Sequence, residues 1–226
     1  MPHSNQASSL AARVKELTQE DHRSAESASF ITELMNGNLS TREYAMLVSQ
    51  YHFIYQALDA AVEHFRDNSQ RPQVVQLFDP KLDRRTAILE DLQTLLPESG
   101  LHPDPVELKS TATYAQRIRN VAGDPARLAA HHYLRYLGDL SGGLAIARLM
   151  QRHYRVHDHQ LNMYTFKTIS KPKLYKDAYR EKLNSLDFTI EQQDAFVDEA
   201  ACGFRYNKAI FEELGTFCKS LTPVAV

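Results

Sequence analysis

The segment between residues 131 and 143 combines glycines with polar side chains that could handle protons. Gly138, Gly142 and Gly143 are three of the eight glycines of the chain, and all three fall inside one expected helix. Each costs about 1 kcal/mol relative to alanine in a helix interior, so some contact must compensate. Gly138 and Gly142 share a face, which leaves bare backbone that another object can touch and allows a kink. Close packing of two helices is the ordinary explanation for such glycines.

Two ionisable residues flank these glycines. Arg135 and Asp139 stand four residues apart on the same expected helix, where such pairs commonly form surface salt bridges that contribute little to stability. Asp139 also lies beside the bare strip of backbone. A carboxylate in that position can donate or accept protons during a reaction, so the segment is a candidate catalytic surface.

A second group that could do chemistry lies near the N-terminus. His22 is one of ten histidines, and a histidine on a helix is more often structural than a metal ligand. Glu26, four residues later, can accept the Nδ1–H of His22 and leave Nε2 for a metal. Lys15 lies two turns earlier on the same face. The spacing therefore favours a metal-binding histidine with a supporting carboxylate.

The elements that must position these residues are helices, because apolar residues recur at helical spacing through most of the chain. Two long helices are opened by the capping-box pairs Ser40 with Glu43 and Thr189 with Gln192. We expect one all-α domain over residues 1–226, with a core at 10–215 and short flexible termini. The expected helices cover about 10–27, 30–35, 40–66, 82–96, 111–122, 125–153, 172–183 and 189–219, with a short turn from Pro72 and a loop over 97–109.

Composition excludes several classes of partner. The 226 residues include 26 Lys and Arg against 28 Asp and Glu, so no basic footprint for nucleic acid is present. No run approaches the roughly 18 apolar residues of a membrane span, and the N-terminus lacks a signal-peptide pattern. Cys202 and Cys218 have neither metal-ligand nor disulfide-framework spacing, which favours reduced, structural cysteines. We expect a soluble, cytoplasmic protein with no nucleic-acid or membrane partner.

The stretch Arg-Tyr-Leu-Gly-Asp-Leu-Ser-Gly-Gly at 135–143 resembles the distal helix of the soluble, bacterial-type haem oxygenases. The resemblance extends over about residues 10–215. It implies a multi-helical fold in which haem is sandwiched between a proximal helix and a kinked distal helix. It also implies that the glycines at 138, 142 and 143 rest on the haem face and that Asp139 holds water above the iron. Leu144 departs from the pattern, since many members carry glutamine there.

The same resemblance implies roles for other residues. His22 matches the family's only protein ligand to the iron of haem b, and Glu26 orients it. Tyr55 matches a tyrosine of the distal hydrogen-bond network, although a core aromatic residue with a satisfied hydroxyl is an equally good interpretation. Arg135 joins it as a candidate catalytic residue. The remaining matches are Lys15, Tyr133, Lys176 and Arg180 at the haem propionates, which need donors, and Phe204 and Asn207 in the haem pocket. Taken alone, the Lys176 and Arg180 pair indicates only a solvated basic face.

The implied activity is the oxidative cleavage of haem, which serves as both substrate and cofactor. Dioxygen and external electrons would convert it to biliverdin, carbon monoxide and ferrous iron, and the four propionate contacts imply the α isomer. Iron acquisition is the expected purpose. No nucleotide-binding motif is visible, so a flavoprotein reductase or a ferredoxin should supply the electrons.

Two alternatives remain at this point: a haem-binding or haem-transfer protein without chemistry, and a thiaminase-like enzyme on the same fold. A di-iron bundle is disfavoured because the chain contains no Glu-x-x-His. The chain also lacks Cys-x-x-Cys-His, so covalently attached haem is not expected.

Overall fold

The computed structural model describes residues 9–221, and within that range the chain forms helices and no strand. The prediction of an all-α chain is confirmed, while the expected flexible termini fall largely outside the described residues. No helix in this range is long and apolar enough to cross a membrane. The α-helices are α1 (Leu10–Leu17), α2 (Gln19–Glu26), α3 (Ser29–Asn36), α4 (Thr41–Asn68), α5 (Pro72–Val75), α6 (Arg85–Glu98), α7 (Lys109–Asn120), α8 (Pro125–Tyr154), α9 (Pro172–Asn184) and α10 (Ile190–Leu221), and the 3-10 helices are η1 (Pro80–Leu82), η2 (Asp158–Gln160) and η3 (Asn162–Tyr164).

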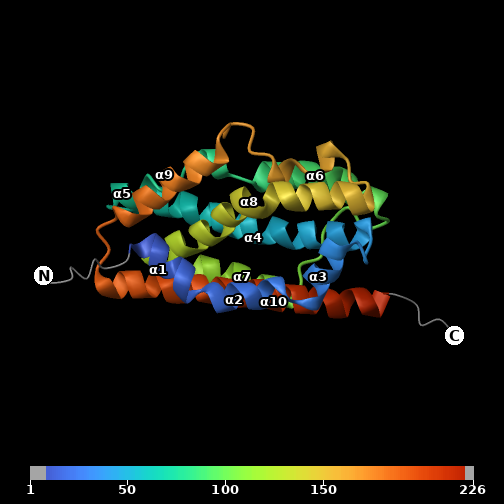
Figure 1. Ribbon diagram of the computed structural model, residues 1–226, viewed down its shortest axis with the longest axis horizontal. Helices are drawn as coiled ribbons and strands as arrows, with labels where there is room; N and C mark the ends of the chain where they lie inside the picture. The colour runs from blue at the N-terminus through green and yellow to red at the C-terminus, as the bar shows by residue number, and fades with distance from the viewer. Residues whose placement is uncertain (1–8, 222–226) are drawn as a thin grey trace, which may run out of the picture.

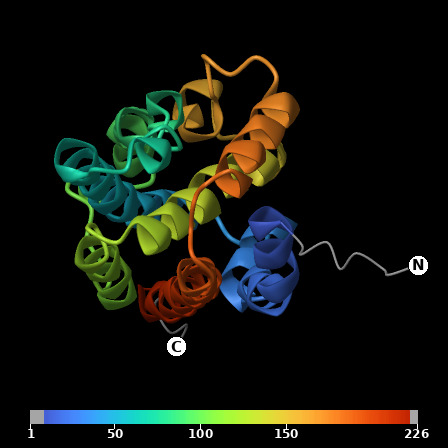
Figure 2. The same ribbon diagram turned by 90° about the vertical axis from the view of Figure 1, so that its left-hand side faces the viewer.

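Three long helices organise the molecule (Figure 1). α10 runs along one side and packs against α8, α7 and the N-terminal helices α1 to α3. α4 packs against α6, α7 and α8, so α8 crosses between α4 and the layer of α10, as the end-on view shows (Figure 2). α9 lies against α1 and α8. Buried apolar residues from α1 to α10 form one contiguous core, and α8 passes through its middle.

The long helices begin where their capping residues predict. Glu43 Oε2 accepts the backbone N–H of Ser40 at 2.8 Å, and Ser40 caps the first turn of α4 in return. At the start of α10, Thr189 N–H donates to Gln192 Oε1 at 3.1 Å, and Gln192 N–H donates to Thr189 Oγ1 at 3.3 Å. Asp124 caps α8 through the backbone N–H groups of its first turn. These local signals confirm the starts of the helices that carry the site.

The prediction of a single helix over 10–27 is wrong, because the helix is interrupted at Thr18. Thr18 has φ −101° and ψ 6°, and its hydroxyl donates to the carbonyl of Val14 at 2.6 Å. A threonine that bonds its own backbone competes with the helical pattern. α2 therefore starts as a separate helix after Thr18.

The expected helix over 82–96 is displaced at both ends. Pro80–Leu82 forms the separate turn η1, in which Asp79 accepts the N–H of Lys81 at 3.0 Å, and α6 starts only at Arg85. Pro97 does not end α6, because Ser99 N–H still donates to the carbonyl of Leu95 at 3.0 Å. A proline in the last turn removes one donor without stopping the helix at that residue.

A buried carboxylate ties α7, α8 and α10 together. Glu199 is 2% exposed; its Oε1 accepts Arg117 Nε at 2.9 Å and its Oε2 accepts Arg117 Nη2 at 2.6 Å. His131 Nε2 lies 2.9 Å from Oε1. Burial alone would raise the pKa of Glu199, but hydrogen bonds from His131 and Arg117 lower that pKa to about 2. The carboxylate is therefore ionised and paired in the folded chain near neutral pH.

We expect Glu199→Gln to destabilise the protein by about 2 kcal/mol near neutral pH, because it removes charge-assisted hydrogen bonds to a carboxylate that is 2% exposed. The pKa of Glu199 falls from 4.5 to about 2 on folding, so its contribution to stability is present above pH 4.5 and is lost as the pH falls towards 2. Urea unfolding of both proteins at pH 7 and pH 3 should show a difference that shrinks in acid. Glu212→Gln is the control, since that side chain is 61% exposed. A difference that stays constant between the two pH values would contradict the assignment.

Candidate active site

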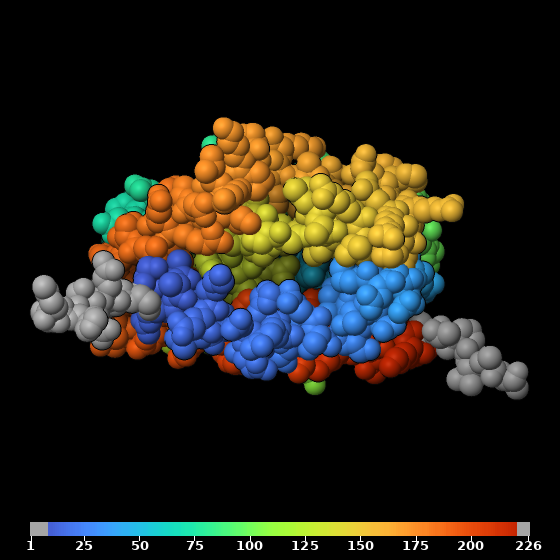
Figure 3. All heavy atoms as spheres, viewed as in Figure 1, coloured from blue at the N-terminus to red at the C-terminus, as the bar shows by residue number. Residues whose placement is uncertain are grey.

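A hollow opens between the N-terminal helices and α8 (Figure 3). α2 and α3 form one wall and the middle of α8 forms the other, and atoms of α4 and α10 are visible at its floor. α8 is one continuous helix from Pro125 to Tyr154. Its central turns carry the glycines and polar residues that the sequence indicated.

Two of the three glycines of α8 present bare backbone to open space. A Cβ atom added at Gly138 would meet nothing within 4 Å, and one at Gly142 would meet only the side-chain tip of Ile146 at 3.9 Å. Helix–helix packing is therefore the wrong explanation for Gly138 and Gly142. Gly143 differs, because a Cβ there would lie 2.9 Å from the ring of Tyr164. Gly143 is buried and allows η3 to pack on α8. The expectation that Gly143 belongs to the open strip with Gly138 and Gly142 is therefore corrected.

We expect Gly138→Ala to stabilise the ligand-free protein and to weaken ligand binding. The added methyl group meets no atom in the structure, and alanine is favoured over glycine in a helix interior by about 1 kcal/mol. The melting temperature of the unliganded variant should rise while its haem affinity, measured by absorbance titration, falls. Gly123→Ala is the matched control, because it also meets open space but lies outside α8. Unchanged haem affinity in Gly138→Ala would contradict a binding role for the strip.

Asp139 and Tyr55 form the centre of the polar wall. Tyr55 on α4 is 0% exposed, and its hydroxyl donates to Asp139 Oδ2. Burial raises the pKa of Asp139, while the charge of Arg135 and the hydrogen bond from Tyr55 oppose the shift. The raised pKa brings this carboxyl group closer to neutral pH, where a group can both give and take a proton.

Arg135 does not form the surface salt bridge that its spacing from Asp139 suggests. It is 6% exposed, and Nη1 donates to Asn207 Oδ1 on α10 at 2.9 Å. Its guanidinium carbon lies 4.7 Å from the ring centre of Tyr51 and 5.0 Å from that of Tyr55. Arg135 Nε is buried without a hydrogen-bond partner. Arg135 thus places a positive charge under the distal tyrosines, where cation–π contacts fix its position.

His22 on α2 is arranged as a metal ligand would be. Its Nδ1 lies 3.2 Å from Glu26 Oε2, and its side chain is 48% exposed. The ring of Phe204 on α10 meets the imidazole edge to face at 4.9 Å. The Glu26 contact directs Nδ1 away from a metal and leaves Nε2 as the ligand.

The donor set decides which kind of metal centre these residues fit. Among the described residues no group of three or more His, Cys, Asp or Glu side chains could hold a metal ion. A single histidine ligand suits a metal that brings its other ligands with it, as porphyrin iron does. His22 together with the bare strip of Gly138 and Gly142 therefore fits a flat, iron-bearing group.

Cationic side chains gather on α9 and its neighbours. Lys176 Nζ donates to Ser141 Oγ on α8 at 3.0 Å, and Arg180 pairs with Asp177 at 2.9 Å. Burial raises the pKa of Tyr133, and the charge of Arg180 opposes that shift, which places Tyr133 close to Arg180. Lys15 is exposed on α1, which packs against α9. These residues can meet an anionic edge of a ligand.

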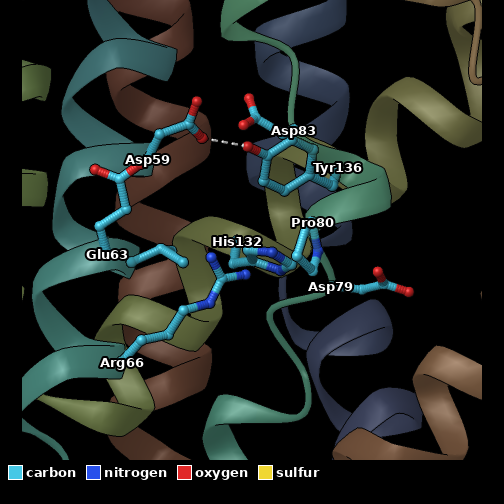
Figure 4. A pocket seen from close by; sticks show the side chains of 9 residues that line it. Asp59, Glu63, Arg66, Asp79, Pro80, Asp83, His132 and Tyr136 are labelled. Atoms are coloured by element: carbon cyan, nitrogen blue, oxygen red, sulfur yellow. Dashed lines mark hydrogen bonds between the residues drawn. The ribbon is translucent and has the colours of Figure 1, made fainter.

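Three residues of the distal side were not identified from the sequence. Asp59 and Tyr136 are joined by a 2.6 Å hydrogen bond, and His132 lies beside them at a small cavity between α4, α8 and η1 (Figure 4). Asp59 follows Tyr55 by four residues on the buried face of α4. A carboxylate on an otherwise apolar helix face is the signal that could have revealed it.

Comparison with known proteins places the chain in one family. The family profile described as "Heme oxygenase" matches residues 8–213. Heme oxygenase 1 of the cyanobacterium Synechocystis is 31% identical over 214 residues, covering 94% of this chain and 88% of that relative. The heme oxygenase of Takifugu rubripes is 32% identical and covers 91% of this chain and 74% of that relative.

Comparison with solved structures indicates the same family. The Synechocystis heme oxygenase-1, solved in complex with heme, aligns with a TM-score of 0.85 at 30% identity over 95% of this chain and 96% of the other. The heme oxygenase of Leptospira interrogans aligns with a TM-score of 0.81 at 32% identity over 91% of this chain and 100% of the other. This chain belongs to the haem oxygenase family. It is an enzyme of the haem-degrading oxygenase class, as its sequence indicates.

Proposed function

We propose that the hollow between α2 and α8 binds haem b as both substrate and cofactor, and that His22 Nε2 would bind its iron. The observation that carries the proposal is the open backbone strip of Gly138 and Gly142 on one wall together with a half-exposed histidine, held by Glu26, on the other. When bound, haem supplies the iron that activates dioxygen and the ring carbon that is oxidised. The products are biliverdin, carbon monoxide and ferrous iron.

The residues of the α8 wall would control proton delivery and the position of oxygen relative to the ring. Asp139, with its raised pKa, holds a water molecule and passes a proton through it, and the Tyr55 hydroxyl fixes the carboxyl group in place. The backbone at Gly138 and Gly142 would lie against bound haem and limit the space beside it, which favours oxidation at the ring edge. Arg135 is a positioning residue that acts through Tyr55 and Asn207.

The orientation of haem would follow from its anionic edge. Lys176, Arg180, Tyr133 and the nearby Lys15 offer donors from three helices to the two propionates. Charge-assisted hydrogen bonds of this kind fix orientation as well as adding affinity. We infer that these donors would fix one orientation of the ring, the one that yields the α isomer of biliverdin. Phe204 packs on His22 and keeps the proximal side apolar.

The electrons come from a separate protein, for which a flavoprotein reductase and a ferredoxin are the two candidates. This electron donor would dock on the face formed by the cationic residues of α9 and α1. Attraction between these cations and an acidic surface on the donor would speed association. We further propose that the enzyme works in the cytoplasm and releases iron for cellular use.

Aerobic single turnover of the haem complex, followed by chromatography of the products, tests the proposal. Addition of ascorbate or a reductase should bleach the Soret band and yield α-biliverdin. A Soret band that persists would instead favour a haem-binding or haem-transfer protein, and failure to bind haem at all would favour another activity on the same fold. A different biliverdin isomer would contradict only the orientation.

A further inference from the structure

An unbroken row of aromatic rings leads from the distal carboxyl group into α9. The ring centre of Tyr55 lies 5.5 Å from that of Tyr136, and Tyr136 lies 4.6 Å from His132. His132 is stacked on Tyr179 at 5.7 Å with an interplanar angle of 7°. Tyr175 precedes Tyr179 by one turn on α9 and is partly exposed. Ring contacts thus join Tyr55 to Tyr179, and the i, i+4 spacing of Tyr175 on the same helix places it next to Tyr179 towards the surface.

Every phenol in this row has a proton acceptor. Tyr55 donates to Asp139, Tyr136 to Asp59 Oδ1 at 2.6 Å and Tyr175 to Asp79 Oδ2 at 2.8 Å. The fourth hydroxyl, that of Tyr179, lies 2.8 Å from His132 Nδ1. A phenol that loses an electron becomes a strong acid, so an acceptor at hydrogen-bond distance lets the electron and the proton leave together.

His132 has the protonation state that this arrangement needs. Burial and the charge of Arg66 lower the pKa of His132 to about 3, so the imidazole is neutral and Nδ1 can take the Tyr179 proton. A neutral imidazole is harder to oxidise than a phenol. His132 therefore serves as a bridge between Tyr136 and Tyr179 rather than as a stopping point for the electron hole.

A small cavity lies beside the bases of Tyr136 and Tyr175 (Figure 4). It has a volume of about 30 Å³ and is lined by Asp59, Asp79, His132 and Tyr136, which is enough for a water molecule. Asp59 Oδ2 is buried without a hydrogen-bond partner. Burial and the neighbouring Asp83 raise the pKa of Asp59 to about 8, so the carboxyl group can take a proton on one oxygen and release one from the other.

Hydrogen bonds alone do not define the row, which is set apart by the successive ring contacts from Tyr55 to Tyr179. Buried tyrosine hydroxyls usually find some partner, and outside the row that partner varies: the hydroxyl of Tyr114 lies 3.3 Å from His131 Nδ1. Tyr154 donates to the backbone carbonyl of Leu34 at 2.7 Å, and the hydroxyl of Tyr44 has no hydrogen-bond partner. Bases occur at the hydroxyls of the tyrosines that form the row.

We propose that Tyr55, Tyr136, Tyr179 and Tyr175, bridged by His132, carry oxidising equivalents from the hollow to the surface when hydrogen peroxide reacts with the haem-loaded protein. The proposal rests on haem binding in the hollow. At each transfer one electron moves inward from a phenol to its oxidised neighbour, and the proton of that phenol moves to its bonded base. The inner phenoxyl regains its electron and takes its proton back from its own base. Tyr175 ends one electron and one proton short, and a thiol or ascorbate in solution restores both. The row would protect the site from damage in unproductive turnovers.

The test locates the radical rather than measuring turnover. Haem-loaded protein is mixed with hydrogen peroxide and a nitroso spin trap, and adducts are mapped by peptide mass spectrometry, with freeze-quench EPR as a check for tyrosyl radicals. Native protein should carry its main adduct on Tyr175. His132→Gln keeps an acceptor for Tyr179 but removes the ring, and it should lose the Tyr175 adduct and gain one on Tyr136. Tyr136→Phe should also lose the Tyr175 adduct, and Tyr154→Phe, outside the row, should not.

Equal Tyr175 adducts in native protein, His132→Gln and Tyr136→Phe would overturn the proposal, as would their absence from the native protein. A missing Soret band would instead overturn haem binding. In that case a flash-generated ruthenium(III) complex supplies the oxidant from solution. An adduct on Tyr136 in native protein but not in His132→Gln would still support the row, and equal adducts in both would reject it.

Discussion

Asp139→Ala should bind haem as tightly as the native enzyme and form biliverdin at least about 100-fold more slowly, since a positioned acid–base group contributes 10² to 10⁴ in rate. Asp139 touches no group of the proximal side, so the His22 ligation is untouched. Without the carboxyl group, whose pKa burial raises, no side chain holds the water that delivers the proton. Dioxygen and electrons would then be consumed without opening the ring. Soret titration measures binding, and chromatography after single turnover measures biliverdin.

Two further variants sharpen this prediction. Asp139→Asn keeps the shape of the side chain and can still contact Tyr55, so a loss as large as that of the alanine variant would assign the effect to the proton. Asp198→Asn on α10 is the control, because Asp198 is exposed. Undiminished biliverdin from Asp139→Ala would remove Asp139 from the mechanism.

His22→Ala should lose more haem affinity than any other single change. Among the described residues no group of three or more His, Cys, Asp or Glu side chains could hold a metal ion, so no preformed site replaces the lost nitrogen. Glu26→Gln should cost less, about 10- to 100-fold in affinity or activity, as is usual for a residue that orients a metal-bound histidine. Absorbance and EPR spectra of the haem complex report the axial ligand directly.

Added imidazole provides the rescue experiment for His22→Ala. It should occupy the vacated position and restore a native-like spectrum and part of the activity. His64→Ala on α4 is the control, because that histidine is exposed. A His22→Ala variant with native spectrum and turnover would show that another residue binds the iron.

Much of the site could be predicted because it depends on local spacing. The His22–Glu26 contact and the shared face of Gly138 and Gly142 both follow from helical geometry. Capping residues likewise fixed the starts of α4, α8 and α10, since a cap acts within a single turn.

What could not be predicted depends on packing between helices. Nothing within one turn of Arg135 indicates that it turns towards Asn207 on α10 instead of Asp139, which is nearer in sequence. The orientation of Gly143 is decided by Tyr164, which reaches it from η3. The break at Thr18 was also missed, because a threonine hydroxyl can bond its own backbone or another partner, and the sequence does not say which.

The interruption at Thr18 leaves His22, the proposed iron ligand, on an eight-residue helix that buries only Ala25. Segments with so few buried contacts open at a small fraction of the free energy needed to unfold the whole chain. Haem, bonded to His22, would anchor α2 to the rest of the enzyme. Once the ring is opened and the iron released, this contact is lost and α2 can move away from α8. Product release would then follow from the loss of the bond to His22. Amide hydrogen exchange in residues 19–26 should therefore be slow in the haem complex and fast after turnover.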